Sequence, residues 1–343
     1  MTIYTFDPLS DARWDDLVGT HPRASAFHTR GWLEALQRTY AFVPLVFTTS
    51  PPGGPLKDGL VFCGVRSWLT GSRLVSVPFA DHCDPLVQTA AGFGDLLGAL
   101  HEATRKEWKY AELRPSAGGV PPAERLQTCA TFCLHTVDMR GALEDIHDRM
   151  HASTIQRKIR RADREQLRYE EGRSAVLLDR FYELLVLTRK RHGVPPPPKR
   201  WFVNLMACLG DAAKIRVAWK DRRAIGSIVT LQHRQTLVYK YGASDPAFHN
   251  LGAMPFLFWE AIKDAKEAGL ETLDLGRSDP SNAGLITFKE RLGGVSSPLT
   301  YVRYSARPLG AATTTFGRRS RLFAWLPEPL LIMAGRILYR HTA

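Results

Sequence analysis

Hydrophobic residues recur along the chain at two spacings, one typical of helices and one typical of strands. Helical spacing is clearest in residues 29–40, where Trp32, Leu33, Leu36 and Tyr40 share one face. Further helices are expected at residues 11–19, 92–108, 153–166, 175–193, 200–210 and 252–269. Strands are expected at residues 42–49, 59–68, 72–79, 110–115, 131–139, 167–172, 213–220, 223–234, 235–244 and 270–276. This mixture of strands and helices predicts an α/β (α+β) fold.

The length of 343 residues, with 44% hydrophobic residues, predicts more than one domain. We expect a first domain at residues 1–150 and a second at 151–308. Very short connections join the three expected strands between 213 and 244, so the second domain should contain an antiparallel meander. Residues 309–343 combine arginines with large apolar residues and predict a basic amphipathic tail helix.

The formal net charge of +12 predicts attraction to phosphates, nucleic acid or an anionic membrane surface. From Arg303 to the end there are seven arginines and one acidic residue, Glu328, so half of the net charge lies there.

The five cysteines are an odd number, and the first residues lack the pattern of a signal peptide. No run approaches the apolar length of a membrane-spanning helix. We therefore expect a cytoplasmic protein.

The stretch DLGRSDPSNAGLITFKERLGG, residues 274–294, places Lys289 in an apolar and glycine-rich setting after an expected strand. Asp274, Arg277 and Ser278 fall where that strand ends, a position that presents polar groups to a cleft. Arg277 can hold a phosphate or carboxylate with two hydrogen bonds. The alternatives are an exposed Lys289 on a helix face and a salt bridge between Asp274 and Arg277 or Arg291.

Two tyrosines lie two residues apart on the expected strand 235–244, so both should share one face of a sheet. We assign Tyr239 to the core. Tyr241 is the better candidate for a site, together with Ser244, because the strand opens into a loop there.

Basic residues gather in two helices. Arg157 and Lys158 belong to the expected helix 153–166, whose arginines at spacings of three and four form a stripe. Arg189 lies near the end of the expected helix 175–193 and could face a substrate. In both places the alternative is an ordinary solvated helix face.

The loop VPFADHCDPLV, residues 77–87, sets Asp81 and Asp84 on either side of a histidine and a cysteine. Adjacent side chains of an extended segment point apart, so His82 and Cys83 do not make a nucleophilic pair. Zinc needs about four suitably spaced ligands, and the chain offers no convincing set, so we expect no metal. Asp81 and Asp84 either line an acceptor cleft or form an Asx-type turn.

Several motifs, taken in order, resemble a known family. ASTIQRKIRRADRE is similar to a basic helix, and YKYGASDPAFHNLGAMPFLFWEAIKDAKEAG to a strand and helix entry, of Fem-type peptidoglycan bridge ligases. GLITFKERLGG fits their Phe-Lys and Gly-Gly ending. FHTRGWLEAL and VPFADHCDPLV look like a FemAB-like subgroup associated with cellulose and exopolysaccharide synthesis. The resemblance implies two tandem domains of the GNAT acyltransferase type with mixed, largely antiparallel sheets.

The same resemblance implies transfer of an acyl or aminoacyl group to the amine of a cell-envelope or polysaccharide precursor. Direct attack of the amine develops an oxyanion that needs positive charge nearby. It assigns Lys289, with Asp274, to catalysis. The substrate-binding candidates are Arg277, Ser278, Tyr241, Ser244, Arg157, Lys158, Arg189, Asp81 and Asp84.

The donor stays open between acyl-CoA, an acyl carrier protein and aminoacyl-tRNA. HNLGAM keeps only one position of the coenzyme A motif of classical GNAT enzymes, Gly252. A basic surface suits tRNA or an acidic carrier protein. Other functions left open are acetylation of a small metabolite or sugar from acetyl-CoA, and a non-catalytic assembly or RNA-binding role on the same fold. The tail either packs on the second domain or rests on the inner face of the membrane.

Overall fold

The computed structural model describes residues 2–116, 119–121, 123–308 and 323–341. Contacts divide the chain into two compact units. Unit 1 comprises the described residues of Met1–Phe132, Pro298–Thr314 and Ile337–Ala343. Unit 2 comprises those of Cys133–Ser297 and Thr315–Arg336.

Unit 1 is built on a mixed sheet with the strand order β1-β2-β3-β4-β5-β12. Its strands are β1 (Tyr4–Phe6), β2 (Val43–Thr48), β3 (Leu60–Ser67), β4 (Gly71–Val75), β5 (Ala111–Leu113) and β12 (Val295–Tyr304). Only the β4–β5 pair is parallel among the described pairs of this unit. Its helices are α1 (Arg13–Thr20), the 3₁₀ turn Ala26–His28, α2 (Arg30–Tyr40) and α3 (Ala90–Lys106).

In unit 2 the strands follow one another in the order β6-β11-β10-β9-β8-β7, with both parallel and antiparallel pairs. Its strands are β6 (Leu126–Asp138), β7 (Arg168–Gly172), β8 (Ala213–Lys220), β9 (Arg223–His233), β10 (Thr236–Ser244) and β11 (Thr272–Ser278). Its helices are α4 (Leu143–Asp148), a π-helical turn (Ala152–Gln156), α5 (Arg157–Arg164), α6 (Ala175–Arg191), α7 (Lys199–Leu209), the 3₁₀ turns Gly210–Ala212 and Pro246–Leu251, α8 (Ala253–Glu267) and α9 (Ala283–Arg291). The antiparallel meander of β8, β9 and β10 confirms the prediction.

The two units repeat one pattern of strand pairing, counted from β1 in unit 1 and from β7 in unit 2. The first four strands pair antiparallel, the fourth and fifth pair in parallel, and the last strand is antiparallel to the fifth. In sequence, however, the last strand of each unit follows a strand of the other unit. β6 follows β5 in sequence but pairs through Cys133–Asp138 with β11, whereas β12 follows β11 but pairs through Val302–Tyr304 with β5. The contacts therefore change unit at residue 133, within β6, and not at the expected position 150. Mixed strand pairing with flanking helices in each unit confirms the predicted fold class.

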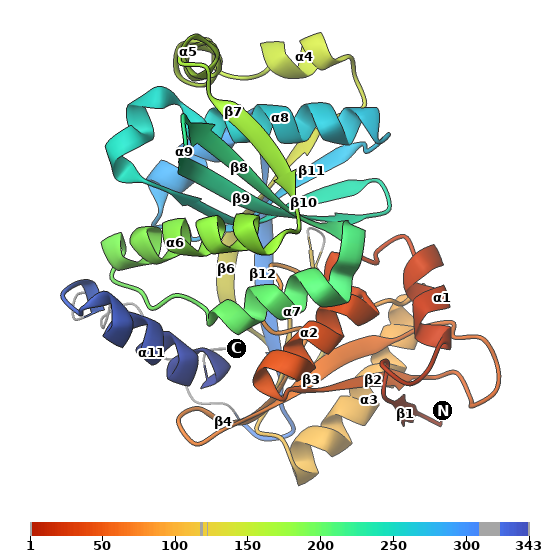
Figure 1. The fold of residues 1–343 in the computed structure, drawn as a ribbon. Coiled ribbons are helices and arrows are strands. Elements are labelled where there is room, and N and C mark those ends of the chain that lie inside the picture. Colours follow the sequence, from red (N-terminus) through yellow and green to blue (C-terminus); the bar gives the residue numbers. More distant parts are fainter. Residues whose placement is uncertain (1, 117–118, 122, 309–322, 342–343) are drawn as a thin grey trace. The chain divides into compact units, whose positions relative to one another are not determined.

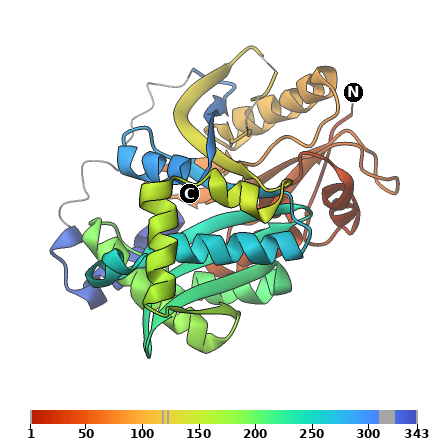
Figure 2. The same ribbon diagram turned by 90° about the horizontal axis from the view of Figure 1, so that it is seen from above.

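In unit 2, helices cover both faces of the sheet. Figure 1 shows α5 and α8 on one face of β8–β10 and α6 and α7 on the other. Figure 2 shows α5 crossing over α8 on their common face. The apolar side of α8, including Leu257, Phe258 and Ile262, is buried in the core of this unit. α6 begins at Ser174, whose hydroxyl accepts a hydrogen bond from the backbone N–H of Leu177, a typical N-cap.

Part of the expected tail, residues 309–322, lies outside the described residues. Beyond it, α11 spans Glu328–Leu338 and a 3₁₀ turn spans Tyr339–His341. Within the described part of the chain, no helix is long and apolar enough to cross a membrane.

Candidate functional site

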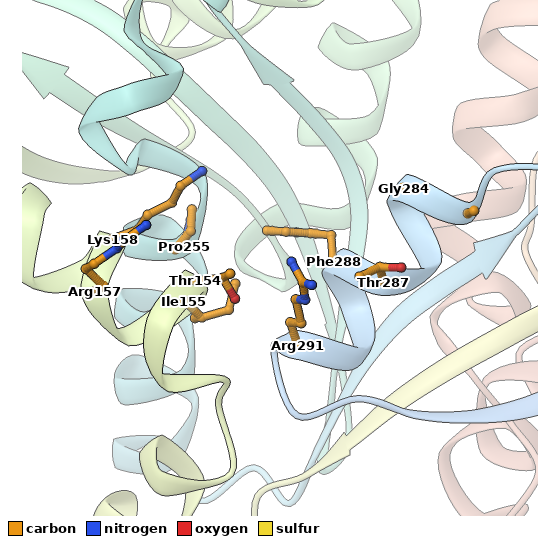
Figure 3. A pocket seen from close by; sticks show the side chains of 10 residues that line it. Thr154, Ile155, Arg157, Lys158, Pro255, Gly284, Thr287, Phe288 and Arg291 are labelled. Carbon is orange, nitrogen blue, oxygen red and sulfur yellow. The ribbon is translucent and has the colours of Figure 1, made fainter.

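A pocket of about 420 Å³ opens in unit 2 between three of its helices. Its lining comes from the π-helical turn and start of α5, from the first turn of α8 and from α9: Thr154, Ile155, Arg157, Lys158, Pro255, Ala283, Gly284, Thr287, Phe288 and Arg291. Figure 3 shows Arg157 and Lys158 on one side of the pocket, facing Phe288 and Arg291 on the other. Three cations and several apolar side chains thus border one cavity.

Local structure explains why these residues meet. On α9, Gly284, Thr287, Phe288 and Arg291 are three or four residues apart, so they form one face of the helix. The backbone N–H of His151 donates to the carbonyl oxygen of Arg291 at 2.9 Å, which ties the end of α9 to the segment before α5. The buried hydroxyl of Thr154, in the pocket wall, has no hydrogen-bond partner among the described residues.

The start of α8 is held close to α5 by a glycine. Gly252 precedes α8 with a φ of 85°, in the left-handed region that favours glycine. A Cβ on Gly252 would lie 2.3 Å from the carbonyl oxygen of Lys158. The positive end of the α8 dipole therefore lies against the same turn that carries Arg157 and Lys158, an arrangement that favours anions.

Lys289 is buried, with 2% of its surface exposed, and is not one of the residues that line the pocket. Its Nζ donates to the carbonyl oxygens of Gly276 at 2.8 Å and Arg277 at 3.0 Å. Both carbonyls belong to β11, at a shift in its register with β6 between Asp274 and Arg277. The alternative of an exposed Lys289 on a helix face is thus excluded.

The register shift in β11 forms a bulge, and Asp274 also bonds to it. Its Oδ1 accepts a hydrogen bond from the backbone N–H of Gly276 at 2.7 Å, and the side chain is buried. Gly276 has a φ of 70°. β11 pairs in parallel with β10 from Thr272 to Asp274, immediately before this bulge. Asp274, Gly276 and Lys289 therefore form one arrangement that fixes the end of the strand.

Two further predicted residues lie next to this bulge. Arg277 is exposed, whereas Ser278 is 1% exposed, and its hydroxyl has no hydrogen-bond partner among the described residues. His135 of β6 is completely buried, and burial, followed by the charge of Lys289, lowers its pKa. Both ring nitrogens of His135 also have no hydrogen-bond partner among the described residues.

The prediction that Tyr239 and Tyr241 share a face is wrong. The register of β10 with β9 shifts between them, so Lys240 is an extra residue in the strand. Tyr239 packs on Phe258 of α8, with ring centroids 4.8 Å apart, as expected for a core residue. The hydroxyl of Tyr241 accepts a hydrogen bond from Trp201 Nε1 of α7 at 2.9 Å, on the other face of the sheet.

Ser244 lies at the end of β10 and contacts a histidine that was not a predicted site residue. Ser244 Oγ and His249 Nε2 are 2.9 Å apart, and Arg191 Nη1 lies 3.3 Å from the same nitrogen. Burial, followed by the charges of Arg191 and Lys158, lowers the pKa of His249. Arg189 is half-buried in the last turn of α6.

Asp81 and Asp84 belong to unit 1 and are buried there. The backbone carbonyl of Asp81 accepts a hydrogen bond from the Tyr301 hydroxyl at 2.6 Å, and Asp84 Oδ1 accepts one from the Ser116 N–H at 3.1 Å. Cys83 Sγ lies 3.3 Å from His28 Nε2. Burial raises the pKa of the Cys83 thiol well above its ordinary value, so it is no activated nucleophile.

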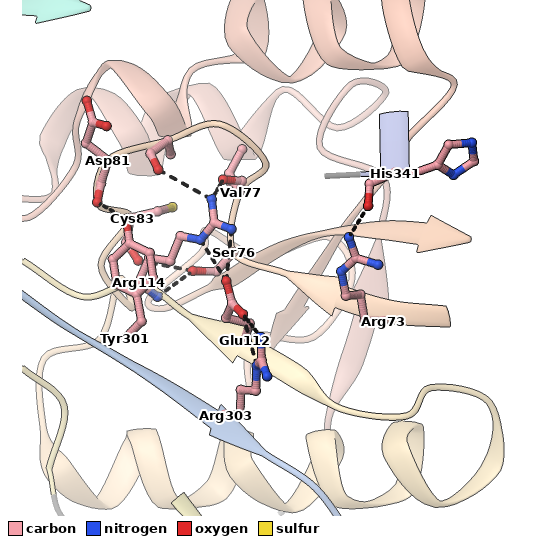
Figure 4. Close-up of polar contacts among 11 residues, drawn as sticks. Arg73, Ser76, Val77, Asp81, Cys83, Glu112, Arg114, Tyr301, Arg303 and His341 are labelled. Atoms are coloured by element: carbon pink, nitrogen blue, oxygen red, sulfur yellow. Dashed lines mark hydrogen bonds and ion pairs between the residues drawn. The ribbon is translucent and has the colours of Figure 1, made fainter. Parts of the chain in front are cut away.

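Figure 4 shows a polar network beneath that loop. Arg114 Nη2 and Arg303 Nη2 each lie 2.9 Å from a different carboxylate oxygen of Glu112. Arg114 also donates to the carbonyl oxygen of Val77 at 3.2 Å. The network therefore holds the 77–87 loop in place. Among the described residues, no three His, Cys, Asp or Glu side chains are grouped so as to hold a metal ion.

The sequence of this protein matches a family described as acetyltransferase (GNAT) domain over residues 149–289. Residues 149–289 form a GNAT domain. The pocket's α5 and α8 sides, the β11 bulge and Lys289 all lie in the matched range, and the GNAT domain indicates an acyltransferase. No curated protein matches the sequence.

Solved structures resemble nearly the whole chain. The crystal structure of FemX is 14% identical and has a TM-score of 0.72, over 89% of this chain and 97% of FemX. The C-terminal domain of a putative lysylphosphatidylglycerol synthetase from Agrobacterium fabrum is 17% identical, with a TM-score of 0.55 over 88% of this chain and 92% of that domain. A tandem GNAT protein from the clavulanic acid biosynthesis pathway is 13% identical, with a TM-score of 0.53 over 90% and 99%. At these identities the likeness is one of fold, and it confirms the expected tandem GNAT-type fold.

Sequence reasoning missed Arg291, Thr154 and Phe288 as pocket residues. For Phe288 and Arg291 the signal is the spacing of residues 284, 287, 288 and 291, which becomes visible only once a helix is assigned to residues 283–291.

Proposed function

We propose that this chain transfers an acyl or aminoacyl group from an activated donor to an amine of a cell-envelope or exopolysaccharide precursor. The proposal includes a cytoplasmic location with peripheral contact to the inner membrane face. The observation that carries it is the pocket in the GNAT domain, where Arg157, Lys158 and Arg291 surround apolar wall residues. A cavity with cations and apolar surface suits an acyl donor that also carries phosphate.

The three candidate donors share that chemistry. Acyl-CoA, the phosphopantetheine arm of an acyl carrier protein and aminoacyl-tRNA all present phosphate near an ester or thioester. Arginine binds phosphate with two parallel hydrogen bonds, and the N-terminus of α8 adds backbone donors and a positive dipole end. We assign Arg157 and Lys158 to the phosphate and Phe288 to the apolar part of the donor.

The transfer step needs few groups from the protein. The acceptor nitrogen bonds to the carbonyl carbon, the bond from that carbon to the donor sulfur or oxygen breaks, and the amine proton ends on the leaving thiol or hydroxyl. Negative charge develops on the carbonyl oxygen in between. We assign Lys289 to stabilise that charge. Asp274 keeps its place in the proposal as the residue that fixes the β11 bulge, where the Gly276 carbonyl orients the ammonium.

We also propose residues that bind the acceptor. The residues that stay predicted to bind substrate are Arg277, Ser278, Tyr241, Ser244, Arg189, Asp81 and Asp84. Of these, Arg277 stands out, because it is exposed at the end of β11 while its own backbone carbonyl accepts from Lys289.

The test is a donor comparison with the purified chain. Labelled acyl-CoA, acyl carrier protein and aminoacyl-tRNA are each incubated with amine-bearing envelope precursors and with small amines and amino sugars. The paired change Arg157→Gln and Lys158→Gln should raise KM for the productive donor roughly tenfold or more, because each lost phosphate contact weakens binding. The exposed Arg222→Gln is the control. Transfer only from acetyl-CoA to small amines would replace the envelope assignment, and no transfer from any donor would reject the proposal.

A further inference from the structure

Two buried polar side chains beside the β11 bulge have no hydrogen-bond partner in the described part of the chain. They are His135 of β6, at both of its ring nitrogens, and Ser278 at the end of β11, at its hydroxyl. The two residues are 0% and 1% exposed. A buried polar group without a partner costs about 1–3 kcal/mol. Such groups are rare in folded proteins, and each one therefore needs a bound water, a ligand or a functional role to explain it.

Strand pairing places these two side chains on one face of β6 and β11. Ser278 lies directly opposite Cys133 of β6, so their side chains point the same way. His135 is two residues along β6 from Cys133 and therefore shares that face. His135 and Ser278 are thus diagonal neighbours, which lie about 7–8 Å apart in ordinary sheets. One water between their polar atoms can bond to both side chains.

Lys289 reaches the same place from α9. Its ammonium donates to the carbonyl oxygens of Gly276 and Arg277, the two residues before Ser278. His135 lies opposite this bulge, because β11 has one residue more than β6 there. Burial, followed by the charge of Lys289, lowers the pKa of His135, so its ring is neutral at pH 7. A neutral imidazole with two unpartnered nitrogens is therefore buried next to the ammonium that we assign to the reacting carbonyl.

The proposed transfer needs a group that accepts a proton. When the acceptor amine bonds to the carbonyl carbon, its nitrogen becomes positively charged, so the intermediate carries an ammonium as well as the oxyanion. That nitrogen must lose a proton, and the leaving sulfur or oxygen must gain one. Lys289 cannot accept the proton, because its side chain is already an ammonium that donates to two carbonyls.

We propose that His135 accepts this proton through a water held by Ser278 and then returns it to the leaving group. An N–H bond of the intermediate breaks and a ring nitrogen gains the proton. The ring loses it again as the S–H or O–H bond of the leaving group forms. The oxyanion that forms beside Lys289 offsets the ammonium charge, so His135 becomes a stronger base as the intermediate appears. This proton path rests on the proposed function and extends it.

The kinetic test compares His135→Leu with the wild type, using the productive donor. His135→Leu should lower kcat roughly 10²-fold or more, the usual effect of losing a group that transfers a proton. The fall of kcat below pH 6.5 should disappear, and the ratio of rates in H₂O and D₂O should move toward one. Ser278→Ala should lower kcat by a smaller factor and keep the fall at acid pH. The charges that act on His135 come from Lys289 and Glu290 of α9, and these variants leave both in place.

His233→Leu is the matched control. Burial lowers the pKa of this histidine too, and its Nε2 has no hydrogen-bond partner among the described residues, but it belongs to β9, two strands away from β11. His233→Leu should keep kcat, its dependence on pH and the solvent isotope ratio. Thermal unfolding is measured beside kcat. His135→Leu should be at least as stable as the wild type, so a slower reaction cannot be attributed to unfolding.

A crystal structure of the wild-type chain tests the water without the reaction. It should show a water within hydrogen-bond distance of the His135 ring and the Ser278 hydroxyl. The proposal fails if no water joins the two side chains, or if His135→Leu keeps kcat and the solvent isotope ratio of an active wild type. Either result leaves the proposed function standing. No transfer by the wild type from any donor would instead overturn the proposed function, and the proton path with it.

Discussion

Lys289 donates from Nζ to the carbonyl oxygen of Gly276 at 2.8 Å, across the gap between α9 and the bulge of β11. Its neighbour in sequence, Phe288, faces the pocket instead. Successive residues of a helix point about 100° apart, so α9 presents one side chain to the donor pocket and the next to the strand end. The Lys289 ammonium therefore supports the β11 bulge. It is also the group that we assign to stabilise the negative charge on the reacting carbonyl oxygen.

We expect Lys289→Ala to lower kcat by about 10²–10³, the usual loss when one donor to a developing oxyanion is removed. Lys289→Arg should recover only part of this activity, because the larger guanidinium does not fit a site that is 2% exposed. The measurement is steady-state transfer with the productive donor. Lys266→Ala removes the same charge from a surface position of α8 and should keep full activity.

A support role alone would give a different pattern. Lys289→Ala would then lower the melting temperature, and the remaining folded enzyme would turn over at nearly the normal rate. Thermal unfolding of each variant, measured beside kcat, separates the two. Normal kcat in folded Lys289→Ala protein would remove Lys289 from catalysis.

Gly252→Ala should destabilise unit 2 by about 2–4 kcal/mol, because a side chain is strained at positive φ and its Cβ meets backbone that cannot move away cheaply. The obstacle is the Lys158 carbonyl oxygen, 2.3 Å from the point that the added Cβ would occupy. Gly269→Ala is the matched control, since its φ is 72° and nothing lies within 4 Å of its Cβ. Denaturant unfolding should show the larger loss for Gly252→Ala, and KM for the donor should rise with it. Equal losses would mean that the contact between α8 and α5 contributes nothing.

Periodicity predicted most helices and strands, because each pattern is local to its segment. It could not predict that β6 pairs with β11 and β12 with β5, since strand pairing depends on residues far apart in sequence. The same holds for Tyr239 and Tyr241, because the shift at Lys240 exists only against β9. A helix at residues 283–291 was considered only in the alternative for Lys289, and no strand was expected at residues 295–304. Motifs predicted Lys289 and Arg157 as site residues. Arg291 could be predicted as a pocket residue only from the helix at residues 283–291, which those motifs do not define.

His135 should make unit 2 sensitive to mild acid. Burial, followed by the charge of Lys289, lowers its pKa below 6.5, so the folded protein holds it neutral while the unfolded chain binds a proton. The stability that this difference supplies is full above pH 6.5 and declines as the pH falls toward the folded pKa. His135→Leu should flatten the dependence of the free energy of unfolding on pH in that window. It should also stabilise unit 2 at the acid end, because a buried polar ring is replaced by an apolar side chain.

The control is His151→Leu, which removes an exposed histidine of the same unit. That change should leave the slope of stability against pH unaltered. Parallel profiles for the wild type and His135→Leu would show that another group causes the acid sensitivity.

Glu112 should control the stability of unit 1 at lower pH. Burial alone would raise the pKa of this carboxyl, but the charges and hydrogen bonds of Arg114 and Arg303 outweigh burial and hold the pKa below 4.5. The contribution of Glu112 to the free energy of unfolding is therefore complete above pH 4.5 and is lost as the pH falls through the folded pKa. Glu112→Gln should destabilise unit 1 by about 3–5 kcal/mol at neutral pH, since two arginines lose their buried counter-charge. Asp138→Asn, which breaks an exposed pair with Arg140, should change little. Thermal unfolding of both variants across this pH range checks these expectations. If the acid transition persists unchanged in Glu112→Gln, other carboxyl groups cause it.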